Sequence, residues 1–478
     1  MKSIKRIIAV IIILTVLMSS SVYSAATADP DLTSRKDFLW GVCIHTPDIN
    51  SSIYGQGNTE EQIHLAAELG VKIIRTGISS NISHTDKFVR LANAYGIKVM
   101  AVVSIPGKTY DADTAVDLER IKSVYKTYAS RYDGKHGYGK IDYIQIDNEM
   151  DNDLMGRYGV ATEGSSINNY NQIDLATLTP QVKAAVEGIK ESGSDVKSVI
   201  NFAFRHYGML DYFYQNGVEW DVIGHDWYSD GMAYDESHGK TPYQIGEELY
   251  KKFGKEIILC EHNALGTGSD FDADASNWDI VVRAMQDYYN KDYVIGAIFY
   301  ELCDEINRQT GDAYEREAHF GLCFTKDNGE IIGPKPIYTR IQKIIGGGTV
   351  EKLNWEEVEA TYEIPKENNS DEADDYTSEN QNSGLQSIKD NLNNSGGLRE
   401  NVTIVEVTPD PVIKKNTATE TTVKKIPYSS GKIFTIPIII SVVIGALALG
   451  YTVFTVFYIL RKKKNTKPDL KTVLIDED

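Results

Sequence analysis

The sequence is short of positive charge, cysteine and histidine. Lys and Arg number 49 against 68 Asp and Glu, which gives a formal net charge of −19. No basic stretch outside the two ends could neutralise phosphates, which excludes a nucleic-acid partner. Four cysteines among 478 residues do not make a disulfide framework, and no Cys-x-x-Cys or Cys/His spacing suggests zinc. We therefore expect no metal and no other cofactor, and we expect Cys43 and Cys260, which lie in apolar runs, to be buried thiols.

Two apolar runs near the ends of the chain determine the expected compartment. Lys2, Lys5 and Arg6 precede the first run, residues 7–18, and small residues follow it as far as Ala28. This order is typical of a secretory signal peptide, here residues 1–28, and the run is short for a membrane-spanning helix.

The second apolar run, residues 434–460, contains no charged residue. It is long enough to cross about 30 Å of hydrocarbon, and a buried core helix is the alternative. The basic cluster 461–464 follows at once, so the positive-inside rule places the tail, residues 461–478, in the cytoplasm. The sequence predicts a single-pass protein of the cell membrane with an extracellular main part.

Two regions of different composition lie between these runs. Residues 36–348 are dense in apolar runs, whereas residues 349–432 are rich in Asn, Ser, Glu, Asp and Thr. The polar region has too few apolar residues to offset the entropy of ordering, so we expect a disordered, low-complexity stalk. The run Gly346-Gly347-Gly348 marks the boundary.

The apolar region alternates eight β-rich runs with amphipathic helical ones. Continuous Val, Ile and Phe runs are typical of parallel strands that are buried on both faces. Eight such units predict a (β/α)8 TIM barrel. An open doubly wound sheet is the alternative, but it would have a Gly-rich phosphate loop after the first strand, where this chain has Cys43-Ile44-His45-Thr46-Pro47. The expected strands are 38–44, 71–75, 98–104, 141–146, 197–202, 221–225, 256–260 and 294–300; the expected helices lie near 60–69, 86–95, 114–132, 181–192, 209–216, 243–253, 278–290 and 337–345.

Two glutamates follow expected strands on opposite sides of this barrel. Active sites of such barrels lie at the C-terminal ends of the strands, and Glu149 and Glu261 follow the fourth and the seventh. Retaining glycoside hydrolysis needs a carboxyl pair about 5–5.5 Å apart, of which one is protonated and the other ionised. Arg75, after the second strand, could keep Glu261 ionised. A structural salt bridge is the alternative for either glutamate taken alone.

Asn148-Glu149 after the fourth strand, together with Glu261 after the seventh, resembles clan A of the glycoside hydrolases. That clan includes cellulases of family 5, β-xylosidase-like enzymes of family 39 and galactanases of family 53. The resemblance covers residues 37–346. It implies that Glu149 is the general acid/base and Glu261 the nucleophile. It also implies that Asn148 hydrogen-bonds the 2-hydroxyl of the sugar and that Arg75 braces the nucleophile.

The resemblance also implies further substrate-binding residues at the ends of the sixth and eighth strands. A residue of the segment 225–228, by preference Tyr228, would hold Glu261 in line, although His225 and Tyr228 are one residue further apart than in the usual His-x-Tyr motif. Tyr300 stands where the clan often has a Trp under the sugar. Trp227 is either a sugar platform or a core residue. Family 5 usually carries a His near the end of the third strand, where this chain has Ser104-Ile105-Pro106.

These observations predict an extracellular, membrane-anchored retaining glycoside hydrolase that cleaves β-glycosidic bonds of an oligo- or polysaccharide. A metal-dependent barrel hydrolase would have His-x-His after the first strand, where His45 stands alone. A non-catalytic glycan-binding barrel and a transglycosylase that remodels surface polysaccharide remain as alternatives.

Overall fold

The computed structural model describes residues 28–45, 59–79, 81–156, 164–229, 241–265, 273–305, 317–326 and 329–362. All of them belong to one of the two compact units into which the chain divides, Met1–Val402. The other unit, Thr403–Asp478, lies outside the described residues, and so do the expected membrane helix, nearly all of the expected signal peptide and most of the stalk. Within the described ranges, no helix has both the length and the apolar character needed to cross a membrane.

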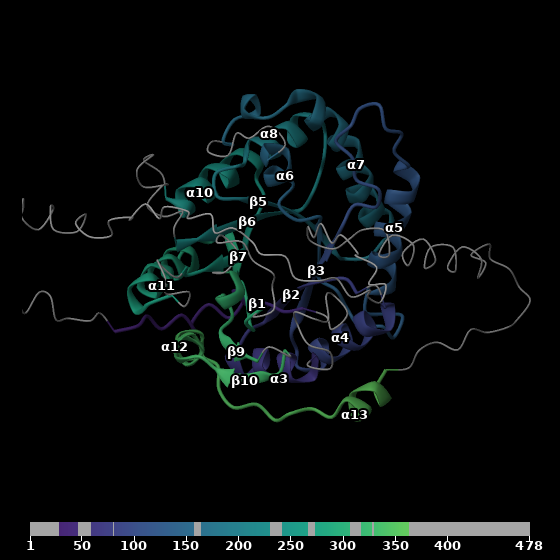
Figure 1. Cartoon of the computed structure of the whole chain (residues 1–478). Coiled ribbons are helices and arrows are strands. Elements are labelled where there is room, and N and C mark those ends of the chain that lie inside the picture. Colours follow the sequence, from purple (N-terminus) through teal and green to yellow (C-terminus); the bar gives the residue numbers. More distant parts are fainter. Residues whose placement is uncertain are drawn as a thin grey trace, which may run out of the picture. The chain divides into compact units, whose positions relative to one another are not determined.

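A closed barrel of eight parallel strands forms the centre of the fold (Figure 1). Each strand pairs with the next one along the chain, and β8 returns to β1 with Leu39 opposite Gly296. The predicted (β/α)8 barrel is therefore confirmed, and the alternative of an open sheet is wrong. The strands are β1 Leu39–Cys43, β2 Ile73–Gly77, β3 Lys98–Val103, β4 Tyr143–Ile146, β5 Lys197–Ala203, β6 Val222–Tyr228, β7 Ile257–Asn263 and β8 Val294–Phe299.

Helices cover the outside of the barrel (Figure 1). After β8 the chain forms a small antiparallel pair, β9 Cys323–Thr325 with β10 Ile331–Pro334, before the helix α12. The helices are α3 Thr59–Leu69, α4 Ile82–Ala94, α5 Leu118–Arg131, α6 Met150–Gly156, α7 Gln172–Glu191, α8 Gly208–Gln215, α10 Pro242–Phe253, α11 Ala275–Tyr289, α12 Pro336–Ile345 and α13 Trp355–Ala360, with the 3-10 turns η1 Ile167–Asn169 and η2 Glu317–His319.

Apolar side chains fill the barrel from within and also separate it from its helices. The inner cluster includes Ile73, Met100 and Ile258, and a larger cluster packs between the strands and the helices. Each buried side chain of this kind contributes about 1.5–3 kcal/mol to folding. Cys43 and Cys260 belong to the inner cluster, which confirms that both are buried thiols, and burial raises the pKa of the Cys260 thiol well above its usual value.

Helix α7 begins nine residues before the expected start at residue 181. The side chain of Asn171 caps it by accepting the backbone N–H groups of Ile173 and Asp174, and Leu175 and Leu178 extend its buried face. Pro180 lies inside the helix, a position that proline usually disfavours. The cap and the buried leucines outweigh the hydrogen bond that a proline cannot donate.

The folded unit extends past both limits that the composition suggested, residues 36 and 348. Before the first limit, Leu32 is buried and its N–H donates to Ile344. After the second, α13 packs on α4, and Val358 is buried between them. The composition misled here because few apolar residues hold this short polar helix in place: Val358 is buried, and Leu353, Trp355 and Tyr362 are partly buried against the core.

Strands β6 and β7 each run three residues further than expected. A register irregularity follows His225, after which Asp226 lies opposite Glu261. Residues 226–228 and 261–263 are therefore strand residues of the barrel rather than loop residues beyond it, and their positions are fixed by backbone pairing.

The close contact between α5 and α7 provides a test of this packing. A Cβ atom added at Gly188 would lie 2.2 Å from the backbone oxygen of Lys122, and backbone cannot move aside as a side chain can. We expect Gly188→Ala to lower the free energy of unfolding by about 1–3 kcal/mol in denaturant titrations.

Gly246→Ala is the matched control, because this glycine is also helical but its nearest neighbour would be the flexible side-chain end of Ile257 at 3.2 Å. It should be neutral or stabilise by up to about 1 kcal/mol. Equal stability of the two variants would contradict the close approach of α5 and α7.

Candidate active site

Glu149 stands at a sharp turn between β4 and α6. Asp147 and Glu149 both adopt left-handed backbone conformations, with φ of 57° and 44°. Such conformations cost of order 1 kcal/mol or more in residues other than glycine, and they persist where the surroundings hold them. Lys108 pairs with Asp147 at 2.8 Å, and the backbone N–H of Glu149 donates to Asn201 Oδ1 at 3.1 Å. The turn directs the Glu149 side chain to the mouth of the barrel.

Glu261 lies on β7, and both of its carboxylate oxygens are held. Arg75 Nη1 donates to Oε1 at 2.8 Å, and the hydroxyl of Tyr228 donates to Oε2 at 2.7 Å. Burial, followed by the charge of Glu261, raises the pKa of Tyr228 well above its usual value, so its hydroxyl keeps the proton that it donates. A cation and a hydroxyl donor together stabilise the ionised form of the carboxyl.

Arg75 connects the site directly to two other strands, β4 and β7, and through Asn148 to β5. It comes from β2 and is only 5% exposed. Besides its bond to Glu261 on β7, its Nε donates to Gln145 Oε1 on β4 at 2.8 Å, and its Nη2 donates to Asn148 Oδ1 at 2.7 Å. Asn148 Oδ1 also accepts from Gln145 and from Asn201 on β5, so the orientation of its amide is fixed with Nδ2 as the remaining donor.

Glu149 has an environment opposite to that of Glu261. Burial, then the charges of Glu261 and Asp151, raise its pKa to about 8. Asn152 Nδ2 opposes this by donating to Glu149 Oε2 at 2.9 Å. His206 Nδ1 lies 3.1 Å from Asn152 Oδ1 and fixes the amide in that orientation.

The two glutamates are close enough for retention. Carboxylate oxygens of Glu149 and Glu261 lie within 4.8 Å of each other. Inverting enzymes keep their carboxyl groups about 6.5–9.5 Å apart to admit a water molecule, whereas retaining enzymes need about 5–5.5 Å. One carboxyl that keeps its proton and one held as an anion, at this spacing, can carry out a double displacement.

The structure brings most of the expected site residues together at this mouth. Arg75, Asn148 and Tyr228 contact the glutamates or each other as described above. Tyr300 is half-buried at the end of β8, where its ring lies edge-on to Phe320 with centroids 6.2 Å apart, and Phe320 also lies 5.5 Å from the ring of Tyr228. The three rings form an aromatic group beside Glu261.

His225 and Trp227 do not join this group, and their expected roles in binding substrate are corrected. His225 Nε2 lies 2.8 Å from the carbonyl of Phe204, its ring stacks on Phe202, and burial lowers its pKa to about 4. Trp227 is 0% exposed and packs in the core between barrel and helices. Because side chains alternate along β6, Asp226 and Tyr228 face the site while these two face outward.

The polar residues that the sequence reasoning missed lie on the strands themselves. Gln145 and Asn201 are fully buried. Each is a polar residue inside an otherwise apolar strand, which is the signal that could have found them. Asn152 lies in the first turn of α6, a helix that was not expected.

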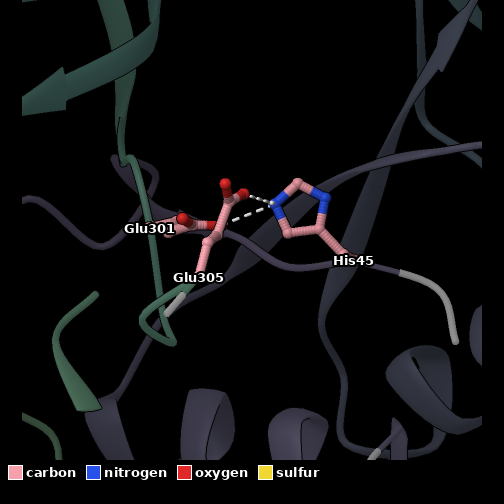
Figure 2. A group of neighbouring side chains, drawn as sticks. All are labelled: His45, Glu301 and Glu305. Atoms are coloured by element: carbon pink, nitrogen blue, oxygen red, sulfur yellow. Dashed lines mark hydrogen bonds and ion pairs between the residues drawn. The ribbon is translucent and has the colours of Figure 1, made fainter. Parts of the chain in front are cut away.

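Among the described residues, two side-chain clusters each bring three potential cation ligands within 4.8 Å of one another: His45 with Glu301 and Glu305, and Glu149 with Asp226 and Glu261. In the first, His45 Nε2 lies 2.6 Å from Glu301 and 3.5 Å from Glu305, so the ring contacts both carboxylates directly (Figure 2). In the second, the guanidinium of Arg75 supplies a positive charge. Our expectation of no metal stays a prediction.

The family model of glycosyl hydrolase family 53 matches residues 53–311, more than half of the chain. This chain belongs to glycosyl hydrolase family 53. It is therefore a retaining β-glycoside hydrolase that acts on O-glycosyl bonds, and the expected membership of clan A is confirmed.

Solved structures similar to this family 53 chain include a family 1 β-glucosidase from Thermotoga maritima, which is 14% identical, covers 67% of this chain and 99% of its own, and has a TM-score of 0.46. The family 53 catalytic domain from Ignisphaera aggregans is 17% identical, covers 65% and 96% of the two chains, and has a TM-score of 0.44. The comparison with curated proteins gives no match. Membership of family 53 rests on the family model.

Asn152→Ala tests the environment of Glu149. The variant removes the donor that stabilises the ionised carboxyl, so the pKa of Glu149 rises above about 8 and the proton is retained to higher pH. We expect the alkaline limb of the kcat/KM profile to move up by about half to one pH unit.

Asn216→Ala is the control, since that amide donates to Tyr212 at an exposed helix end. A limb that moves down, or moves equally in both variants, would show that Asn152 does not set this proton affinity.

Proposed function

We propose that this chain is an extracellular, membrane-anchored retaining hydrolase of a polysaccharide, in which Glu149 is the general acid/base and Glu261 the nucleophile. A β-linked galactan is the first candidate substrate, because the resemblance to family 53 is a resemblance to galactanases. One observation carries the assignment of roles: Glu261 is held as an anion by Arg75 and Tyr228, within 4.8 Å of a glutamate whose pKa is raised to about 8.

The first displacement forms a glycosyl ester on the enzyme. The Glu261 carboxylate attacks the anomeric carbon while Glu149 gives its proton to the leaving oxygen, so that the glycosidic bond breaks and an ester bond to Glu261 forms. Arg75 and Tyr228 hold the attacking carboxylate in place. Asn148 Nδ2 is oriented as a donor and supports a role in binding the 2-hydroxyl of the sugar.

The second displacement releases the sugar with its configuration retained. Glu149, now ionised, takes a proton from a water molecule as that water attacks the anomeric carbon. The ester bond breaks, and Glu261 returns to the carboxylate that Arg75 and Tyr228 stabilise. Tyr300 remains the proposed aromatic surface under the sugar.

Removal of each glutamate in the presence of azide tests the two roles separately. Glu149→Ala still allows the glycosyl ester to form from an aryl galactoside with a good leaving group, and azide then attacks it to give the β-glycosyl azide. Glu261→Ala leaves room for azide in place of the nucleophile and gives the α-glycosyl azide. Each variant alone should lower kcat/KM on galactan by about 10³-fold or more.

Glu68→Ala, at a half-buried position of α3 away from the strand ends that carry Glu149 and Glu261, is a matched control for loss of a glutamate and should keep activity within about twofold. Unchanged sugar release in both active-site variants would contradict catalysis by this pair. If Glu149→Ala gave the α-glycosyl azide and Glu261→Ala the β-glycosyl azide, Glu149 would be the nucleophile and Glu261 the acid/base.

The proposed location rests on residues 1–28 and 434–460, with the basic cluster 461–464 after the second run. Protease treatment of intact cells should digest or release the barrel and leave a C-terminal epitope tag attached to the tail intact, and permeabilised cells should lose both. A barrel that survives on intact cells while the tag is digested would contradict this orientation.

A further inference from the structure

Asp226 adds a third carboxyl group to the catalytic centre. It lies on β6 directly opposite Glu261 on β7, because of the register irregularity after His225. Carboxylate oxygens of Glu149, Asp226 and Glu261 all lie within 4.8 Å of one another. The two displacement steps described above use two of these three groups and leave Asp226 without a role.

The hydrogen bonds of Asp226 are few and fixed. Asn201 Oδ1 accepts the backbone N–H of Glu149, so Asn201 Nδ2 faces the other way and donates to Asp226 Oδ2 at 2.5 Å. The second oxygen, Oδ1, is buried and has no hydrogen-bond partner in the described parts of the chain. Because only 1% of its surface is exposed, hydration by bulk water hardly stabilises Asp226. A carboxylate in this position would be poorly solvated.

The positive charge nearest to Asp226 is that of Arg75, which pairs with Glu261. The charged and titratable groups that face it are Arg75 from β2, Glu149 after β4, and Glu261 and the Cys260 thiol from β7. Arg75 donates to Glu261 at 2.8 Å, while its Nε and Nη2 donate to neutral amides. Arg75 thus forms its ion pair with Glu261, and three carboxyl groups share one cation.

We propose that Asp226 is a positioning residue that stays protonated throughout the catalytic cycle, so that Arg75 balances one carboxylate at a time. This rests on the proposed roles of Glu149 and Glu261. In the free enzyme, the anion of Glu261 balances Arg75, while Glu149 and Asp226 are neutral. In the glycosyl ester, Glu261 is neutral and Glu149 has lost its proton to the leaving group, so its anion balances Arg75.

The net charge of the centre is zero in both states only if Asp226 keeps its proton. An ionised Asp226 would leave the buried centre with one excess negative charge at every step, which is costly in a low-dielectric site. Burial, then the charges of Glu261 and Glu149, raise the pKa of Asp226 well above its usual value, in agreement with this charge balance. Because Asn201 donates to Oδ2, the proton lies on Oδ1, the buried oxygen that has no hydrogen-bond partner in the described parts of the chain.

Asp226→Asn is the first test, because it keeps the shape and the neutral charge of a protonated Asp. We expect the alkaline limb of the kcat/KM profile to lie within about 0.3 pH unit of that of the native enzyme, whatever the level of kcat. If Asp226 were ionised in the native enzyme, the substitution would remove a negative charge beside Glu149. The limb would then move to lower pH by roughly two units, and that result would overturn the proposal.

Infrared difference spectra between the native protein and Asp226→Asn test the proton directly. At pH 7 we expect the variant to lose the carbonyl band of a protonated carboxylic acid, and loss of a carboxylate band instead would overturn the proposal. Glu149→Gln is the internal reference. The band assigned to Asp226 should persist at a pH above about 8, where the band assigned to Glu149 has disappeared.

The protonation of Asp226 and the catalytic roles of Glu149 and Glu261 can be tested separately. The infrared titration needs no turnover, so it reports the protonation of Asp226 even if Glu149 and Glu261 prove not to be the catalytic pair. Thermal unfolding of Asp226→Asn checks that the variant is folded. Azide products from the Glu149 and Glu261 variants decide the proposed function independently of Asp226.

Discussion

A guanidinium group enclosed in the mouth of a barrel has to be neutralised, and in this protein Glu261 neutralises it. The contact of 2.8 Å between Arg75 and Glu261 joins β2 to β7 across the barrel. Removing one partner of a buried pair typically costs about 3–5 kcal/mol, because the other charge is left uncompensated. The remaining donors of Arg75 hold Gln145 and Asn148, so the position of the turn that carries Glu149 also depends on this pair.

The barrel changes from an apolar interior to a polar mouth through irregular strand pairing. Side chains of a regular strand alternate between its two faces, so Glu261 would face outward if Cys260, the preceding residue, faces the interior. Cys260 belongs to the inner apolar cluster, yet Glu261 bonds Arg75 inside the mouth. The register shifts between β6 and β7 and between β7 and β8 account for both orientations. The same irregularity brings Asp226 opposite Glu261.

The sequence was sufficient to predict the barrel and the close pairing of Glu149 with Glu261, because continuous apolar strands and strand-end carboxylates are local signals. It was insufficient where tertiary contacts decide. His225 ends the expected sixth strand and Trp227 follows it, but both are outward-facing residues of a longer β6. The part played by Asn201 depends on hydrogen bonds to two neighbouring strands, and no spacing within one strand encodes that.

The short helix α13 determines how mechanical load reaches the enzyme. It is the last element in the described part of the chain, and everything that follows is joined to the barrel through it. Two hydrogen bonds flank α13 and fasten it to α4. Leu353 donates to Tyr95, the C-terminal cap of α4, and the hydroxyl of Tyr362 donates to the carbonyl of Arg90 within α4. A pull from the C-terminal side would therefore strain these two contacts before it reached the strands. The contacts of 2.7–2.9 Å that hold Glu149 and Glu261 would be strained only after those of α13.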